Sequence, residues 1–232
     1  MKYLSTRDNS LKKSFNEILY QGLSKDGGLY LPVKWPTINI DNLENKSYEE
    51  LALEIIFPFV KENFTKSDLQ HILNESYANF KHEKKAPIKE LQTNKYILEL
   101  IYGPTYAFKD YALQFLGKLF SNSLVINPRK ITVLGATSGD TGSAAIHAFK
   151  TNQDINVFIL HPHGKVSPMQ QKQMTTVDEE NIFNIAIDGN FDDCQKIVKT
   201  LFVDDEIQNR TSLTAINSIN WARLIAQVVY YF

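Results

Sequence analysis

The feature that most constrains this chain is the alternation, after Pro87, of short apolar runs with segments of helical periodicity. Continuous apolar strands separated by helices are what a parallel sheet covered on both faces requires. Right-handed crossovers join such strands, so we expect an α/β fold built from doubly wound parallel-sheet units. The expected strands are 96–101, 131–134, 155–160 and 183–187, with 213–216 as a further candidate, and the helices between them begin near Lys109, Thr141, Ser167, Phe191 and Ile219.

The first part of the chain has a different pattern and predicts a small, mostly helical unit with two short strands. A capping box at 47–50 precedes one helix, which Pro58 should bend or end near its last turn. We therefore expect a small N-terminal α+β domain at 1–86 and a second domain at 87–232. The apolar helix that reaches Phe232 has no capping residue after it, so we expect the chain to be cut inside the second domain.

Charge and composition argue against several classes of protein. Lys and Arg number 25 against 26 Asp and Glu, and the net charge of −1 argues against a nucleic-acid partner. No stretch approaches the roughly 18 apolar residues of a membrane span, and no signal-peptide core is present. The single Cys194, expected as a small buried hydrophobe, indicates a reducing compartment, so we expect a cytoplasmic protein. His161 and His163 lack a spaced third ligand, so no metal site is expected.

The segment GPTYAFKD at 103–110 follows an expected strand and runs into a helix. Lys109 would then lie at a strand-to-helix turn, near the positive end of the helix dipole and among apolar neighbours. Both the dipole field and desolvation favour the neutral amine, which is the form that Schiff-base chemistry needs. From periodicity alone, a solvated lysine in a first helical turn is the simpler interpretation.

The segment GATSGDTG at 135–142 lies between an expected strand and a helix. Its hydroxyls and backbone N–H groups gather at one helix N-terminus, an arrangement suited to a carboxylate or a phosphate. The glycine spacing fails the dinucleotide fingerprint, and no Lys-Ser or Lys-Thr pair follows as in a phosphate-binding P-loop. The alternative is simple helix capping by Ser138, Asp140 or Thr141.

A third segment, NSINWAR at 217–223, also follows a short strand and opens a helix. Ser218 and Asn220 could cap that helix. Arg223, about one turn in, could instead present its fork of donors to a phosphate that Ser218 also contacts. Ligands bind open parallel sheets at the carboxyl ends of their strands, so we expect these helix starts and Lys109 to converge there.

These motifs together resemble the threonine synthase family, specifically its bacterial and fungal branch, over the whole length of the chain. The resemblance implies a tryptophan-synthase-β-like fold that uses pyridoxal phosphate, preceded by the N-terminal domain of that branch. The motifs that carry it are YLSTR at 3–7, DGGLYLP at 26–32, GPT at 103–105 with AFKD at 107–110, ATSGDTG at 136–142, GKVSP at 164–168, and NSIN at 217–220 with Arg223.

The resemblance also implies an activity, the conversion of O-phospho-L-homoserine and water to L-threonine and phosphate. Lys109 matches the lysine that holds the cofactor and moves protons once substrate has displaced it. The other positions that match family sites are Asp140 and Asn217 beside the cofactor, Ser138, Gly139 and Thr141 at the substrate carboxylate, Ser218 and Arg223 at the substrate phosphate, and Lys165 as a helper from a loop.

Other functions remain open on the sequence. A related phospho-lyase would stop at elimination and release a keto acid, and a noncatalytic domain would keep the fold without the cofactor. A nucleotide-binding domain is disfavoured by the loop spacing. Family members are about twice as long, and this chain ends before the expected glycine-rich loop for the cofactor phosphate. We therefore expect the chain as written to be weakly active or inactive, and the sequence makes no prediction of oligomeric state.

Overall fold

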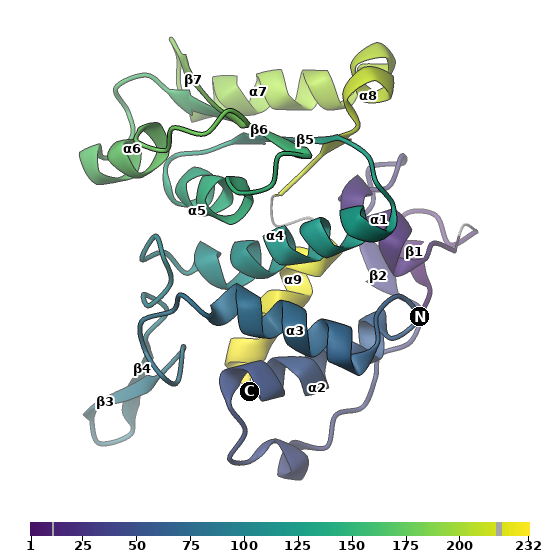
Figure 1. The fold of residues 1–232 in the computed structure, drawn as a ribbon, viewed down its shortest axis with the longest axis vertical. Coiled ribbons are helices and arrows are strands. Elements are labelled where there is room, and N and C mark those ends of the chain that lie inside the picture. The colour runs from purple at the N-terminus through teal and green to yellow at the C-terminus, as the bar shows by residue number, and fades with distance from the viewer. Residues whose placement is uncertain (11, 217–219) are drawn as a thin grey trace.

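The computed structural model describes residues 1–10, 12–216 and 220–232, which fold into helices arranged around one parallel sheet and two small antiparallel ones (Figure 1). In chain order the elements are β1 (Tyr3–Ser5), α1 (Phe15–Gln21), β2 (Tyr30–Pro32), the 3-10 helix η1 (Ile40–Leu43), α2 (Tyr48–Val60), α3 (Lys66–Tyr77), β3 (Ile88–Gln92), β4 (Lys95–Leu98), α4 (Lys109–Ile126), β5 (Ile131–Ala136), α5 (Asp140–Phe149), β6 (Ile155–Pro162), α6 (Pro168–Thr175), β7 (Ile182–Ile187), α7 (Phe191–Phe202), α8 (Asp205–Thr211), β8 (Leu213–Thr214), α9 (Trp221–Val228) and the 3-10 helix η2 (Val229–Tyr231).

The parallel sheet has the order β7-β6-β5-β8, and this confirms the expected α/β fold. Helix α5 covers one face of the sheet and α7 covers the other, while α4 lies outside α5 (Figure 1). The central strand β5 is buried over its first four residues, as a strand covered on both faces must be. The helices predicted near 109, 141, 167, 191 and 219 all begin within two residues of those positions.

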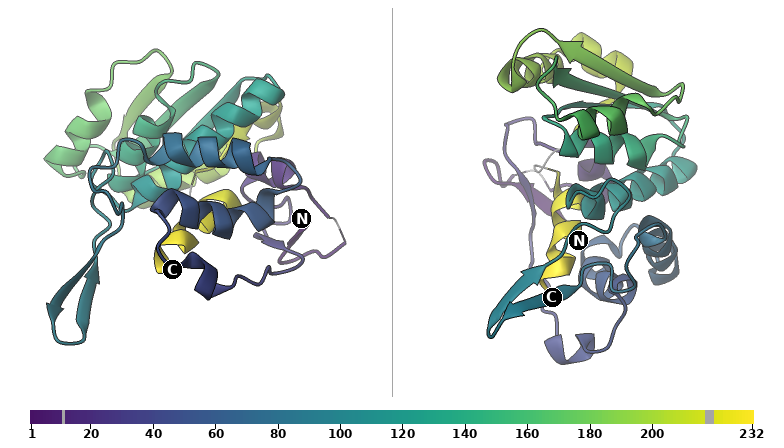
Figure 2. Two further views of the ribbon diagram at one scale, coloured as in Figure 1. Left: turned by 60° about the horizontal axis from the view of Figure 1, so that its bottom comes forward. Right: turned by 90° about the vertical axis from the view of Figure 1, so that its left-hand side faces the viewer.

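The expected parallel strand at 96–101 is wrong. Residues Lys95–Leu98 form β4, which pairs antiparallel with β3, and this hairpin projects away from the sheet (Figure 2). Asn94 takes a left-handed φ of 62° in the turn, a conformation that asparagine tolerates better than most residues. The sequence of β3 is mostly polar and its side chains are exposed, so apolar content does not identify it as a strand.

Helix ends near the start of the chain follow the predicted capping chemistry. Ser47 and Glu50 form the capping box of α2, and Pro58 lies in the last turn before the helix ends at Val60. The acidic run at 204–206 lies at the start of α8, a helix that was not predicted. Its N-cap Asp204 accepts a hydrogen bond from the Ile207 N–H at 3.0 Å.

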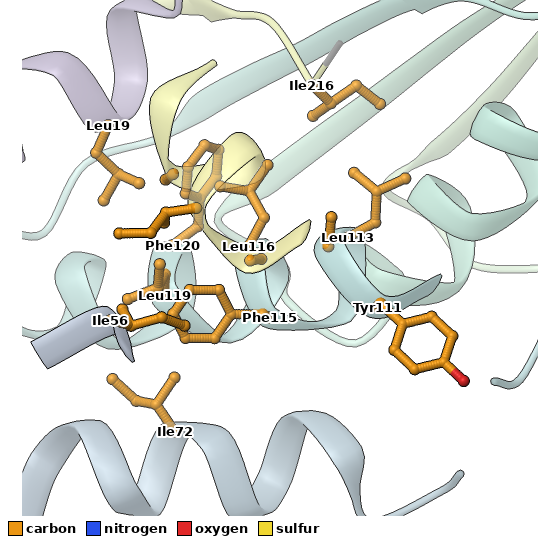
Figure 3. Close-up of a cluster of buried hydrophobic side chains, with 14 of the residues drawn as sticks. Leu19, Ile56, Ile72, Tyr111, Leu113, Phe115, Leu116, Leu119, Phe120 and Ile216 are labelled. Atoms are coloured by element: carbon orange, nitrogen blue, oxygen red, sulfur yellow. The ribbon is translucent and has the colours of Figure 1, made fainter. Parts of the chain in front are cut away.

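Helix α4 runs through the main hydrophobic core and so fixes the position of its first residue, Lys109. Figure 3 shows Phe115 and Leu119 pointing from α4 toward Ile56 of α2 and Ile72 of α3. The same buried cluster extends from β1 to η2, so residues on both sides of position 86 share it. The domain boundary at 86–87 stays a prediction.

We expect Gly117→Ala to destabilise the fold, because α4 and α5 pack closely at Gly117. A Cβ there would lie 2.6 Å from the backbone oxygen of Ala148 in α5, so the two helices would have to separate. Overpacking of this kind costs about 2 kcal/mol of unfolding free energy. Urea denaturation would measure the loss, with Lys118→Ala as the control, since the partly exposed Lys118 is the next residue of α4. An unchanged midpoint for Gly117→Ala would contradict this account of the helix contact.

Candidate active site

Lys109 lies at the amino-terminal end of α4 and is half-buried. Its Nζ atom lies 4.0 Å from the centroid of the Phe108 ring. Burial lowers the pKa of Lys109 because it disfavours the ammonium form, and the nearby Arg223 cation lowers it further, while Asp140 opposes both. A lysine close to one cation and one carboxylate, with its neutral form favoured, is suited to act as a nucleophile or a base.

The turn before Lys109 is held by the buried carboxylate of Asp110. The Thr105 N–H donates to Asp110 Oδ2 and the Thr105 hydroxyl donates to Oδ1, each at 2.8 Å. Gly103 packs so closely on Asp110 that a Cβ at position 103 would collide with it. Burial raises the pKa of Asp110, and the two Thr105 hydrogen bonds oppose that rise. This carboxylate therefore fixes the turn that presents Lys109.

The turn at 137–140 begins α5, and its hydrogen bonds differ from the helix capping that was the alternative prediction. The N-cap is Gly139, and the Thr137 hydroxyl accepts hydrogen bonds from the N–H groups of Gly139 (3.0 Å) and Gly142 (2.9 Å). Capping by Ser138, Asp140 or Thr141 is therefore wrong. Ser138 is exposed and stays available to a ligand at this helix start.

Arg223 of α9 is the cation that acts on Lys109. It is only 2% exposed, and its Nη1 donates to the Ile216 carbonyl at 3.2 Å. Asn220 caps α9 through the Ala222 N–H at 2.9 Å, as the sequence suggested. Burial lowers the pKa of the Arg223 guanidinium. The predicted sites Asn217 and Ser218 lie outside the described residues.

The described structure thus brings together Lys109, Asp140 and Arg223, and it places Lys165 elsewhere. Lys165 is exposed and donates to the Gly189 carbonyl at 2.9 Å, in the loop between β7 and α7. His161 is buried on β6. His163 is exposed, with its Nδ1 3.6 Å from an Asp188 carboxylate oxygen.

Among the described residues, no group of three His, Cys, Asp or Glu side chains is arranged to hold a metal ion. None of their helices has the length and apolar character to cross a membrane. Cys194 is buried, as predicted, and burial raises the pKa of its thiol.

Sequence reasoning gave no role to the residues that hold this site together. Thr105 and Asp110 stand inside the segment that contains Lys109, and their spacing around it was the available signal. Thr137 stands next to the predicted Ser138. Gln170 and Gln173 of α6 contact the site across 30 and 68 residues of sequence, and no pattern within a single helix predicts such contacts.

We expect the Lys109 amine to titrate below the usual lysine pKa of about 10.4. Competitive acetylation across alkaline pH, read by mass spectrometry of the Lys109 peptide, would measure its pKa. Arg223→Met should raise that pKa because it removes a neighbouring cation, whereas Arg223→Lys should raise it less because the charge is kept. Equal values in wild type and Arg223→Met would show that Arg223 does not act on Lys109.

Comparison with known proteins identifies relatives of this chain. A family model described as "Threonine synthase N terminus" matches residues 2–77. The chain is 46% identical over 235 residues to threonine synthase of Pseudomonas aeruginosa, covering 100% of the chain and 50% of the relative. It is 34% identical over 236 residues to threonine synthase-like 2 of Xenopus laevis, covering 100% of the chain and 50% of the relative.

A solved structure, PLP-bound threonine synthase from Brucella melitensis, superposes with a TM-score of 0.93 at 44% identity. That match covers 100% of this chain and 50% of the solved chain. The chain thus spans about half the length of the relatives it matches. Identity at this level, over every residue of the chain and with the same fold, shows that the chain belongs to the threonine synthase family.

Proposed function

We propose that this chain carries the reactive lysine and part of the substrate site of a pyridoxal-phosphate-dependent threonine synthase. The reaction is conversion of O-phospho-L-homoserine and water to L-threonine and phosphate. The observation that carries the proposal is Lys109, half-buried at a helix start with Asp140 and Arg223 as charged neighbours. Residues 1–86 would form the N-terminal domain, and residues 87–232 part of the catalytic domain.

The residues present suit this cofactor and an anionic substrate. An aldehyde reacts with a neutral amine, and the pKa of Lys109 is lowered toward that form. An anionic phosphate suits the cationic guanidinium of Arg223, and an anionic carboxylate suits the N-terminus of α5, where Ser138 is exposed. When bound, pyridoxal phosphate would accept the electrons left on carbon as protons leave the substrate.

Each described site residue then has a role in handling the substrate. Lys109 Nζ takes and returns protons at the substrate carbons, since it is the amine in the site whose neutral form is favoured. Ser138, Gly139 and Thr141 at the start of α5 bind the substrate carboxylate. Arg223 binds the substrate phosphate. Holding both ends of the substrate orients it, so that phosphate leaves and water adds at the correct carbons.

Asp140, Lys165, Asn217 and Ser218 complete the proposed set. Asp140 is proposed beside the cofactor, and its carboxylate also raises the pKa of Lys109 and moderates the effect of Arg223. Asn217 is proposed at the cofactor and Ser218 at the substrate phosphate, from the resemblance alone. Lys165 would have to leave the Gly189 carbonyl to reach the substrate.

A phospho-lyase that shares the fold is the second candidate. The chain is 46% identical to a relative named threonine synthase, which favours the synthase. A noncatalytic binding domain would not account for the lowered pKa of Lys109.

The test is product analysis with the complete gene product, pyridoxal phosphate and O-phospho-L-homoserine. Threonine and phosphate in equal amounts support the synthase, whereas a keto acid with phosphate supports the lyase. Borohydride reduction and peptide mapping should then find a pyridoxyl adduct on Lys109, with the other lysines as internal controls. No adduct and no turnover would support a noncatalytic domain and refute the proposal.

A further inference from the structure

Helix α6 is a polar helix that lies between two parts of the site. Of its eight residues, all within the described chain, only Met174 is buried. Little apolar area therefore holds the helix in place. Its attachment comes from side-chain hydrogen bonds, and two of these go directly to the turns on either side of the site.

Gln173 connects α6 to the turn that presents Lys109. Its Nε2 donates to the Thr105 carbonyl at 3.0 Å. The N–H and hydroxyl of the same Thr105 bind Asp110, so three polar groups of this residue are fixed. Loss of the Gln173 bond would free the Thr105 carbonyl at the point where the turn contacts α6.

Gln170 connects α6 to the start of α5. Its Nε2 donates to the Asp140 carboxylate, and its side chain lies so close to Gly139 that a Cβ there would collide with it. The Ser167 hydroxyl donates to Gln170 Oε1 at 3.0 Å, which fixes the amide orientation. The amide is therefore held against both residues of the Gly139–Asp140 turn.

The C-terminal part of α6 is anchored to strand β7 and to helix α5. Asn184 of β7 donates from Nδ2 to the Met174 carbonyl at 2.9 Å. The Met174 side chain packs on Gly142 of α5, where a Cβ would lie 2.7 Å from its sulfur. These two contacts hold α6 in place between the two turns.

We infer that Gln173 and Gln170 are positioning residues, which hold the turn before Lys109 and the Gly139–Asp140 turn at a fixed separation. The inference rests on the proposed function, because that function needs the amine of Lys109 and the anion-binding start of α5 to face one substrate. Gln173 acts on the lysine side, so its loss should lower kcat. Gln170 acts on the carboxylate side, so its loss should raise KM.

The test compares Gln173→Met and Gln170→Met in the complete gene product with Gln171→Met as the matched control. Methionine keeps the length of glutamine but cannot donate, and Gln171 is an exposed residue of the same helix. A misplaced reacting group costs up to about 100-fold in rate, so we expect kcat of Gln173→Met to fall about 10- to 100-fold. KM for O-phospho-L-homoserine should rise by a similar factor in Gln170→Met.

A second measurement does not depend on turnover. Competitive acetylation of the cofactor-free protein should show the Lys109 pKa rising toward its usual value in Gln173→Met, because the turn opens and burial decreases. It should stay unchanged in Gln171→Met. If Gln173→Met does not fold, Gln173→Asn, which shortens the side chain by one methylene, is compared in its place.

The outcomes separate this inference from the proposed function. Wild-type values of kcat, KM and Lys109 pKa in both variants would overturn the positioning role while leaving the function intact. Absence of a Lys109 adduct and of turnover in the wild type would refute the proposed function, and the acetylation measurement would still test whether Gln173 holds the turn.

Discussion

Lys109→Ala in the complete gene product should lose threonine formation by about 10³-fold or more, and borohydride should leave no pyridoxyl adduct at position 109. The reason is that one amine is asked both to hold the cofactor and to move protons, and proton transfer alone contributes about 10²- to 10⁴-fold. Phosphate and threonine release, measured under saturating substrate, would give the size of the loss. The fold should survive, since Lys109 is at a helix start outside the buried cluster.

Two matched variants test whether the loss of activity in Lys109→Ala comes from the amine of Lys109. Lys109→Arg keeps the positive charge but stays protonated, so it should be as inactive as Lys109→Ala. Lys118→Ala removes another lysine of the same helix, one that pairs with Glu75 at 3.3 Å, and should keep wild-type turnover. If Lys109→Ala retained more than about a tenth of the activity, the amine would not be the proton carrier.

The parts of the fold that were predictable are those in which one chain segment contains the whole signal. Strands β5 and β6 are mainly apolar because they are covered on both faces, and the capping box at Ser47 is a local hydrogen-bond pattern. The β3–β4 hairpin was missed because pairing between two exposed strands depends on their register and the turn at Asn94. Apolar content alone assigned 96–101 to the wrong sheet.

The candidate site likewise contains residues that the sequence predicts and contacts that it does not predict. Arg223 was predictable because it follows β8 and lies near a helix start, and parallel topology brings such starts to one edge. Lys109 lies at the predicted helix start, but the strand before it, β4, belongs to the antiparallel hairpin and not to the parallel sheet. Contacts between distant segments were not predictable, and the Gln173 to Thr105 bond spans 68 residues. Such residues have no periodicity of their own, and only the folded arrangement shows which backbone atoms they reach.

Asp110→Ala should destabilise the protein by about 3 kcal/mol, because it leaves the buried N–H and hydroxyl of Thr105 without their acceptor. Asp110 is fully buried, so water cannot replace the lost carboxylate. Thr105 would then no longer hold the turn before Lys109. Urea denaturation should show the lower midpoint, and amide hydrogen exchange should be faster over 103–110 than in wild type.

Asp110→Asn is the matched variant, and it separates hydrogen bonding from charge. The asparagine oxygen can accept from the Thr105 N–H while its amide donates to the Thr105 hydroxyl. The raised pKa of Asp110 means that the folded protein holds the proton more tightly than the unfolded chain, so wild type loses stability as pH rises from the usual value through the raised one. The neutral asparagine has no such loss. At neutral pH it should match or exceed wild type, and a loss as large as that of Asp110→Ala would show that the charge itself holds the lysine turn.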